Sequence, residues 1–165
     1  MEEKIIKWYP CKKGAIIPTK RDSDSGFDVY AISPITIPAH VTVMISTGLK
    51  VILPDHIWLR AADRGSTGSR GLHVHCGIID EQYTGEIFIA LCNTNDYDIV
   101  ITDEVKEWTT ADDGVGRYYP ITKGIAQLIP EYRVDVVSQI ATEEEFLTAV
   151  AKSERGDGKL GSSGK

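Results

Sequence analysis

The chain has 165 residues, of which 42% are hydrophobic and 25% charged, with a formal net charge of −6. This length and composition suit one globular domain with a single core, and the negative charge argues against a protein that wraps a nucleic-acid backbone. No apolar run approaches the roughly 20 residues of a membrane span, and the N-terminus does not resemble a signal peptide. We therefore expect a cytoplasmic protein with no membrane and no nucleic-acid partner. The three cysteines lack CxxC spacing, so disulfides are not expected to form the framework.

Short β-type runs separated by turn residues follow one another along most of the chain. Residues 5–8 form a possible edge strand, and residues 12–25 are polar and loop-like. The further predicted strands cover residues 27–32, 35–37, 41–46, 49–53, 57–62, 73–79, 86–92, 99–102, 125–129 and 134–137. Prolines fall between these runs, where a missing N–H group is harmless. Many short strands with regular turn signals predict an all-β fold, an antiparallel barrel or sandwich.

One short helix is predicted near the C-terminus. Thr142 and Glu145 form a capping box, and acidic residues occupy the first turn, where the helix dipole favours them. Residues 153–165 are rich in glycine and serine, a composition that cannot hold a core. This segment is expected to be a flexible C-terminal arm. It is either a disordered terminus or an arm that orders over an anion, because its backbone N–H groups can converge on phosphate oxygens.

The segment from Cys76 to Asn93 is predicted to be a hairpin of two buried strands joined by a polar turn. Asp80 and Tyr83 lie at its corner, between two runs that are expected to be dry. Asp80 can simply start the turn, and Tyr83 can simply be a half-buried ring. The alternative is functional: backbone groups at the hairpin mouth could recognise a flat heterocycle while Asp80 activates a water molecule beside it.

Five segments, taken in order, resemble the five motifs of the trimeric deoxyuridine triphosphatase (dUTPase) family. They are SGFDVYA at 25–31, DRGS at 63–66 with Gly71 and Leu72, GIID at 77–80 with Tyr83 and Gly85, KGIAQLI at 123–129, and RGDGKLGSSG at 155–164. The resemblance implies a jelly-roll-like (β-clip) fold over residues 1–152. It also implies a homotrimer in which three subunits share each active site, the arm of one closing over a pocket built by the other two.

The activity that the resemblance implies is hydrolysis of dUTP to dUMP and pyrophosphate, which keeps uracil out of DNA and supplies dUMP. Water would attack the α-phosphorus with the assistance of Mg²⁺, and Asp80 would be the general base for that water. Tyr83 would lie beneath the deoxyribose. Asp28 would hold Mg²⁺ through a water molecule, since that ion keeps several of its waters. The alternative is that Asp28 is simply a carboxylate at the start of a strand.

Further residues take roles from the same resemblance. Arg64 and Gln127 would make catalytic contacts with phosphate or water. Contacts with the substrate are expected from Ser66, Gly77, Ile79, Tyr83, Arg155, Leu160, Gly161, Ser162 and Ser163. A guanidinium suits this work because its planar fork binds phosphate oxygens in pairs, although a solvated surface charge is the alternative for Arg64 and Arg155. Backbone groups fixed by strands could select uracil, because cytosine would leave them unpaired.

Three positions depart from the family pattern. Gly65 stands where the second motif usually has serine, and Gly124 where the fourth commonly has arginine. Leu160 replaces the tail phenylalanine that covers uracil. Leucine keeps apolar cover but loses a base–aromatic stacking worth about 1–3 kcal/mol, so we expect a looser lid and a higher KM.

The connection 94–122 is longer than the usual turn of the family. It is either a decorated surface loop or an insert that binds a regulatory protein partner, as in some bacteriophage relatives. Two other functions stay open: a dCTP deaminase or bifunctional dCTP/dUTP-acting relative, and a non-catalytic nucleotide-binding regulatory module. A deaminase needs a glutamate where this chain has Ala90. His73 and His75 could form half of a zinc site, but no third ligand is evident.

Overall fold

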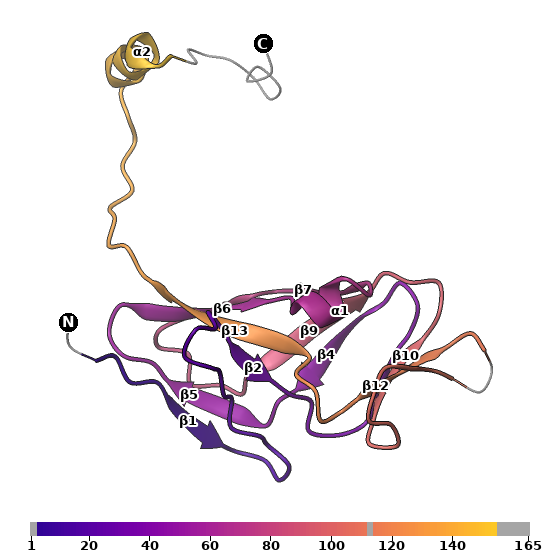
Figure 1. The fold of residues 1–165 in the computed structure, drawn as a ribbon. Helices are drawn as coiled ribbons and strands as arrows, with labels where there is room; N and C mark the ends of the chain where they lie inside the picture. The colour runs from indigo at the N-terminus through magenta and orange to yellow at the C-terminus, as the bar shows by residue number, and fades with distance from the viewer. Residues whose placement is uncertain (1–2, 112–113, 155–165) are drawn as a thin grey trace. The chain divides into compact units, whose positions relative to one another are not determined.

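The structure is a computed structural model, which describes residues 3–111 and 114–154. The chain divides into two compact units, Met1–Arg133 and Val134–Lys165. β-strands dominate the first unit (Figure 1). They are β1 (Lys7–Pro10), β2 (Phe27–Val29), β3 (Ile35–Ile37), β4 (Thr42–Ser46), β5 (Leu49–Ile52), β6 (Ile57–Ala62), β7 (Leu72–His75), β8 (Ile78–Ile79), β9 (Phe88–Asn93), β10 (Ile99–Thr102), β11 (Thr109–Thr110), β12 (Arg117–Pro120) and β13 (Ala126–Tyr132). A short helix, α1 (Gly65–Gly68), follows β6.

The described strands form small sheets with the orders β2-β13-β6-β8, β11-β12-β10-β3, β4-β9-β7 and β1-β5. Neighbouring strands run antiparallel, except that β10 and β12 pair in parallel. The predicted all-β fold with largely antiparallel pairing is therefore confirmed. Strands distant in sequence become neighbours in this way, and β13 lies between β2 and β6.

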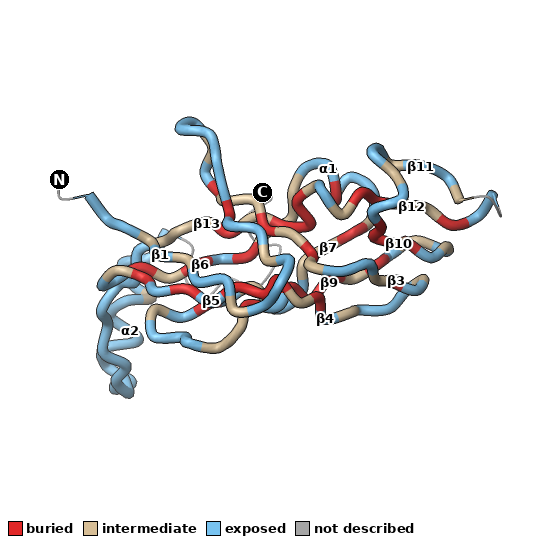
Figure 2. Tube along the Cα trace, turned by 90° about the horizontal axis from the view of Figure 1, so that it is seen from below, coloured by how far each residue is buried: buried red, intermediate tan, exposed pale blue. Residues whose placement is uncertain are grey.

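The buried side chains of the first unit form one hydrophobic cluster to which most strands contribute. Along β6, Ile57, Leu59 and Ala61 are buried while the residues between them are half-buried or exposed. This alternation is expected of a strand with one face on a core. Figure 2 shows that the buried stretches follow the strands, whereas the exposed residues gather in the loops. The loops that carry the polar candidate residues are thus anchored at both ends by strands of the hydrophobic core.

Three strand predictions differ from the structure. The run 73–79 breaks at Cys76, whose φ of 59° lies in the left-handed region, and so forms β7 and β8 in different sheets. Residues 134–137 form no strand, and three valines there are 74–84% exposed. β-branched side chains favour a strand only where a partner covers them, and none does within the described residues. The N-terminal edge strand was predicted at 5–8; β1 lies two residues later and pairs with β5.

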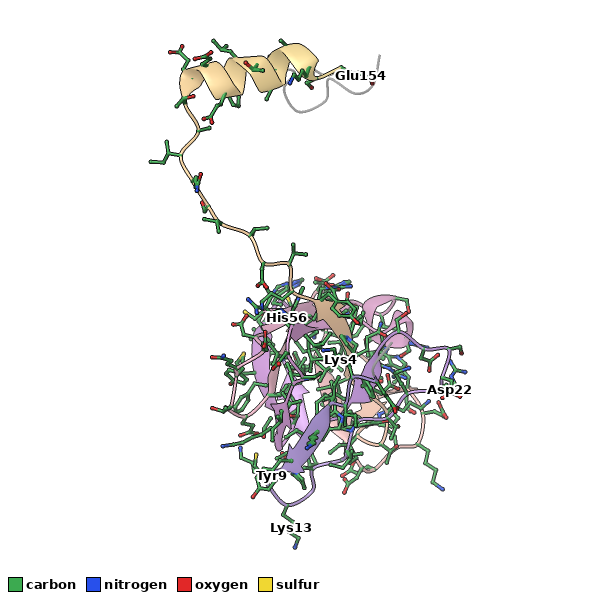
Figure 3. The ribbon with its side chains drawn as sticks, turned by 90° about the vertical axis from the view of Figure 1, so that its left-hand side faces the viewer. Lys4, Tyr9, Lys13, Asp22, His56 and Glu154 are labelled. Carbon is green, nitrogen blue, oxygen red and sulfur yellow. The ribbon has the colours of Figure 1, made fainter. Side chains whose placement is uncertain are left out.

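The second unit contains the predicted helix, α2 (Glu143–Lys152). The Thr142 hydroxyl accepts a hydrogen bond from the Glu145 N–H at 3.2 Å, and the Glu145 carboxylate accepts one from the Thr142 N–H at 2.7 Å. The predicted capping box is therefore confirmed. Figure 3 shows the helix side chains pointing outward, in agreement with the exposure of residues 141–149. Among the described residues, no helix is long and apolar enough to cross a membrane.

Candidate active site

An ion pair between Asp28 and Arg64 forms the centre of one candidate site. Asp28 lies on β2, and Arg64 lies in the loop between β6 and α1. Arg64 Nε donates to one carboxylate oxygen and Nη2 to the other, each at 2.8 Å. Both side chains are half-buried. Such a two-point pair fixes the plane of the guanidinium as well as its position.

The other polar candidates from the second and fourth motifs surround this pair. Arg64 Nη1 donates to the Gly124 carbonyl at 2.9 Å and to the Ser66 hydroxyl at 3.3 Å. Gln127 on β13 stands opposite Asp28 in the β2–β13 register. The structure thus brings together four of the residues singled out in the sequence, although 99 positions separate Asp28 from Gln127.

A cleft of about 870 Å³ opens beside this cluster. Its cationic wall residues are Lys20, Arg21 and Arg64. The rest of the lining is Thr19, Ser23, Asp24, Ser25, Gly26, Asp28, Gly65, Gln127 and Ile129. Hydroxyl, amide and guanidinium groups on one wall suit the oxygens of a phosphorylated ligand.

Asp63 opens the second motif, but no role in the site was predicted for it from the sequence. One of its carboxylate oxygens accepts a hydrogen bond from the Val74 N–H at 2.6 Å, and the other bonds to His73 Nδ1 at 2.8 Å. Its backbone carbonyl accepts a hydrogen bond from Gln127 Nε2 at 2.7 Å. Asp63 therefore ties the Arg64 loop to β7 and β13. The signal that could have found it is its position directly before the motif arginine.

The two histidines considered for zinc have other partners. His73 bonds to Asp63, and His75 Nδ1 lies 3.2 Å from the Thr42 hydroxyl. In the described part of the chain, no three His, Cys, Asp or Glu side chains are grouped so that they could hold a metal ion.

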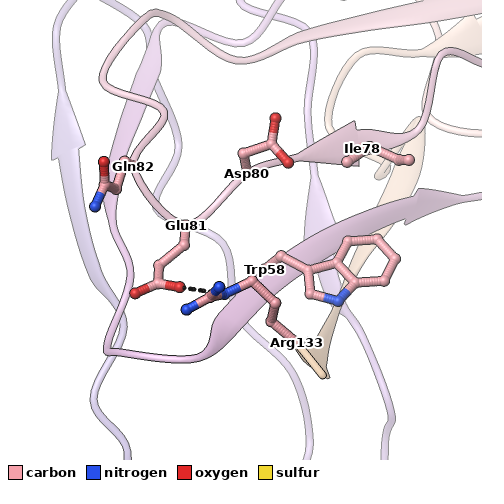
Figure 4. Close-up of a pocket in the computed structure, with 6 residues that line it drawn as sticks. All are labelled: Trp58, Ile78, Asp80, Glu81, Gln82 and Arg133. Atoms are coloured by element: carbon pink, nitrogen blue, oxygen red, sulfur yellow. Dashed lines mark hydrogen bonds and ion pairs between the residues drawn. The ribbon is translucent and has the colours of Figure 1, made fainter. Parts of the chain in front are cut away.

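Asp80 lies in a second cavity of about 530 Å³, which is lined by Trp58, Ile78, Asp80, Glu81, Gln82 and Arg133. The Tyr83 N–H closes the turn on the Asp80 carbonyl at 3.0 Å. Glu81 pairs with Arg133 Nε at 2.9 Å, and Figure 4 shows the Asp80 carboxylate lying apart from this ion pair. Asp80 is exposed, so the dry corner expected around it is absent from the single chain.

The predicted hairpin of two paired strands is wrong. β8 pairs with β6, whereas β9 pairs with β4 and β7. β8 is consequently an edge strand of its sheet, with one row of backbone groups facing away from β6. The Gly77 carbonyl accepts a hydrogen bond from the Ala61 N–H at 2.7 Å, and Ile79 is buried. These two contacts anchor the strand that leads to Asp80.

Glu86 holds the far side of the same turn. Its carboxylate pairs with Lys12 at 2.7 Å and accepts hydrogen bonds from the Ser46 hydroxyl and, at 3.1 Å, from the Gly48 N–H. Burial raises the pKa of Glu86, but the hydrogen bonds and the charge of Lys12 outweigh it, so its pKa lies below the ordinary 4.5. The Tyr83 hydroxyl donates to the Glu86 carbonyl at 2.7 Å, which places the exposed ring of Tyr83 beside the turn.

The candidates thus fall into two separate cavities of one chain. The first contains Asp28, Arg64 and Gln127, the second contains Asp80, and they share no lining residue. The predicted contacts from Arg155, Leu160, Gly161, Ser162 and Ser163 lie outside the described residues.

The largely antiparallel all-β fold, the arginine–carboxylate cleft and the exposed acid on an edge strand define a class: a β protein whose polar cleft suits a phosphorylated ligand. The dUTPase family model matches residues 12–106, and the chain belongs to the dUTPase family. A deoxyuridine 5'-triphosphate nucleotidohydrolase of Candida albicans is 32% identical over 97% of this chain and 88% of the relative. One of Saccharomyces cerevisiae is 30% identical over 98% and 96%.

Solved structures of bacteriophage proteins share the fold. The dUTPase of Staphylococcus bacteriophage 80alpha, in a G164S mutant with dUpNHpp, superposes with a TM-score of 0.73 and 22% identity over 98% of this chain and 99% of that one. The D95N mutant of the dUTPase from phage phi11 of S. aureus, described as coordinating a structural Mg(II) ion, gives a TM-score of 0.66 and 18% identity over 85% and 99%.

Proposed function

We propose that this chain is a dUTP diphosphatase, which hydrolyses dUTP to dUMP and pyrophosphate. Its family and its nucleotidohydrolase relatives support this activity rather than deamination or a purely regulatory role. The observation that carries the mechanism is the separation of one acid, Asp80, from a preorganised phosphate cluster around Arg64.

Asp80 is the proposed general base. Its carboxylate is exposed at the end of the edge strand β8, so a water molecule can reach it. Ile79 and the Gly77–Ala61 hydrogen bond hold the preceding backbone, which limits how far the acid can move. A positioned base that removes a proton from the attacking water contributes roughly 10²–10⁴-fold to the rate.

The Arg64 cluster is the proposed triphosphate site. Asp28 and the Gly124 carbonyl already orient the guanidinium, so little reorganisation is needed when a phosphate arrives. Ser66 is exposed and the hydrogen bond from Arg64 to its hydroxyl is long at 3.3 Å, so this hydroxyl can turn to a phosphate oxygen. Gln127 is proposed to contact a phosphate or a water at the same wall.

Mg²⁺ is the proposed cofactor, and Asp28 is the residue that fits it. Both Asp28 oxygens accept hydrogen bonds from Arg64, so the guanidinium already fixes the orientation of the carboxylate. Each oxygen keeps a second lone pair, which can accept a hydrogen bond from a metal-bound water, and Mg²⁺ retains such waters. When bound, the ion would neutralise charge on the triphosphate.

Base recognition is proposed at the open edge of β8. Backbone N–H and C=O groups there have fixed roles, so uracil and cytosine would not be interchangeable. Gly77 and Ile79 belong to this segment. The Tyr83 ring, held by its hydroxyl on the Glu86 carbonyl, is proposed to lie beneath the deoxyribose.

The two cavities become one site if copies of the chain assemble, and we propose the homotrimer of the family. One copy would supply Asp80, a second the Arg64 cluster, and a third the arm with Arg155, Leu160 and residues 161–163. A protein partner for the insert 94–122 and a cytoplasmic location remain predictions.

Replacement of the proposed base is the test of the activity. Asp80→Asn should retain binding of a non-hydrolysable dUTP analogue while pyrophosphate release falls by roughly 10²-fold or more. Asp55→Asn, an exposed carboxylate outside both cavities, is the matched control and should keep the rate. An Asp80→Asn protein with an undiminished rate would refute the assignment, as would equal turnover of dUTP, dCTP and dTTP by the unaltered protein.

Mixing two inactive variants tests the shared site. Asp80→Asn and Arg64→Ala chains, co-expressed in equal amounts, should regain about a quarter of the unaltered activity, because that share of sites receives both intact residues when copies combine at random. If both residues acted within one chain, no activity would return. Each variant alone is the control.

A further inference from the structure

Tyr119 is buried directly behind the Arg64 cluster. It lies on β12, within the segment 94–122, and is 2% exposed. Its hydroxyl donates to the Gly124 carbonyl at 2.7 Å, and Arg64 Nη1 donates to the same oxygen at 2.9 Å. One carbonyl oxygen therefore carries two donors, one from the hydrophobic core and one from the proposed phosphate site.

Gly124 makes this shared contact possible. A Cβ added at Gly124 would lie 3.1 Å from Asp28 Cβ and Cγ and 3.2 Å from Arg64 Nε. The ion pair therefore packs tightly against the backbone of this residue. Because no side chain intervenes, the orientation of the Gly124 peptide is transmitted directly to the guanidinium.

The ring of Tyr119 packs against Trp108 of the same segment, 94–122. Trp108 meets it edge to face, with ring centroids 5.8 Å apart and an interplanar angle of 74°. Arg70 lies over the Trp108 ring, 5.3 Å from its centroid, and Lys123 next to Gly124 pairs with Glu107. The segment 94–122, which the sequence offered as either a decorated surface loop or a partner-binding insert, thus places Tyr119, with Trp108 packed against it, in contact with the Gly124 carbonyl.

Tyr119 remains a hydrogen-bond donor at working pH. Burial raises the pKa of Tyr119 above its ordinary 10.0, and nearby Arg64 and Ser66 only partly oppose this rise. The neutral phenol can donate to a carbonyl, and the phenolate could not. The protonated hydroxyl is therefore the donor in the 2.7 Å contact with the Gly124 carbonyl.

We propose that Tyr119 is a positioning residue for triphosphate binding: it fixes the Gly124 carbonyl, which in turn holds Arg64 in register with Asp28. The inference rests on the proposed role of Arg64 in binding phosphate. It gives the segment 94–122 a part in the hydrolytic site of this chain, and it identifies a phenol–carbonyl–guanidinium relay in which Tyr119 need not touch the substrate.

The decisive variant is Tyr119→Phe, which removes the hydroxyl and keeps the ring. Loss of one hydrogen bond should weaken binding of an imido-bridged, non-hydrolysable dUTP analogue by about three- to tenfold. Binding of deoxyuridine, which has no phosphate, should not change. Tyr118→Phe is the matched control: Tyr118 is half-buried on the same strand, and both affinities should stay as they are. Equal affinity of Tyr119→Phe and the unaltered protein for the dUTP analogue would overturn the proposal, as would an equal loss for both ligands.

A double-variant measurement separates this inference from the proposed function beneath it. Arg64→Lys should weaken binding of the dUTP analogue, and adding Tyr119→Phe to it should cause little further loss. If Arg64→Lys alone changes nothing, the phosphate role of Arg64 fails. If Arg64→Lys weakens binding but the Tyr119→Phe loss is independent of it, only the relay fails. Thermal unfolding of all four proteins checks that the packing around Trp108 is retained.

Discussion

Gly77 is the position where a single methyl group should do most damage to the site. A Cβ built there lies 2.7 Å from the Ala61 carbonyl oxygen, 0.7 Å short of the 3.4 Å at which ordinary contact begins. The obstacle is backbone, so it cannot rotate away. β8 must then move from β6, which strains or breaks the 2.7 Å hydrogen bond from the Ala61 N–H to the Gly77 carbonyl.

The magnitude follows from three effects. Overpacking against a fixed neighbour costs about 1–3 kcal/mol, and a lost hydrogen bond about 0.5–1.5 kcal/mol. Replacement of glycine by alanine restricts the unfolded chain, which returns about 0.4–1 kcal/mol. We expect Gly77→Ala to lower the free energy of unfolding by about 2 kcal/mol, and Tm by about 4–8 °C. Because β8 carries Asp80, kcat should also fall.

Calorimetry at one fixed protein concentration measures this shift, because Tm of an assembling protein depends on concentration. Gly65→Ala is the control, since a Cβ at Gly65 meets no atom within 4 Å. Its Tm should stay within about 2 °C of the unaltered protein. If Gly77→Ala also melted within that margin, the close approach of β8 to β6 would not govern the placement of Asp80.

Three further expectations concern single positions. Gly65→Ser restores the hydroxyl of the family pattern in open space, so Tm should hold and kcat should rise by up to about tenfold, a gain that steady-state kinetics would detect. Glu86 has a depressed pKa, so its stabilising contribution is present above about pH 4.5 and is lost as the pH falls through its folded value. Tm of the Glu86→Gln protein should therefore fall less steeply on acidification, and identical Tm–pH curves would contradict this. Leu160→Phe should lower KM by returning a stacking contact of about 1–3 kcal/mol, and an unchanged KM would remove the looser-lid argument.

Local chemistry predicted the elements whose causes lie within a few residues. The capping box at Thr142 and Glu145 is such a case, because both hydrogen bonds close within four residues. Strand β6 is another case, because apolar residues at every second position, Ile57, Leu59 and Ala61, are the ones that are buried. The strand predicted at 134–137 is absent, because β-branched residues form a strand only beside a partner strand, and a local sequence pattern does not show whether one is present.

The hairpin failed for a related reason. The apolar run 73–79 has strand-like composition throughout, so nothing in its pattern marks the left-handed backbone at Cys76. Because of this break, β7 and β8 belong to different sheets, and β8, which was predicted to be one strand of the hairpin, is an edge strand. The motifs still singled out Asp28, Arg64, Ser66 and Gln127 for metal and phosphate contacts, and the structure brings these four residues together. Tyr119 could not be found in this way, because it lies outside the five motifs and its burial follows from the position of β12 between β10 and β11.

The charges along the proposed phosphate cleft show why its lining residues alone do not supply enough positive charge for a triphosphate. Within the described residues, Asp28 already pairs with Arg64, and Asp24 pairs with Arg21 at 2.9 Å. Lys20 donates to two backbone carbonyls, at 3.0 and 3.4 Å, and its charge also acts on the nearby Asp24 carboxylate. A triphosphate carries several negative charges, and Asp28 would repel it. Tight binding therefore requires further positive charge, which the proposed Mg²⁺ beside Asp28 and the proposed contact from Arg155 would supply.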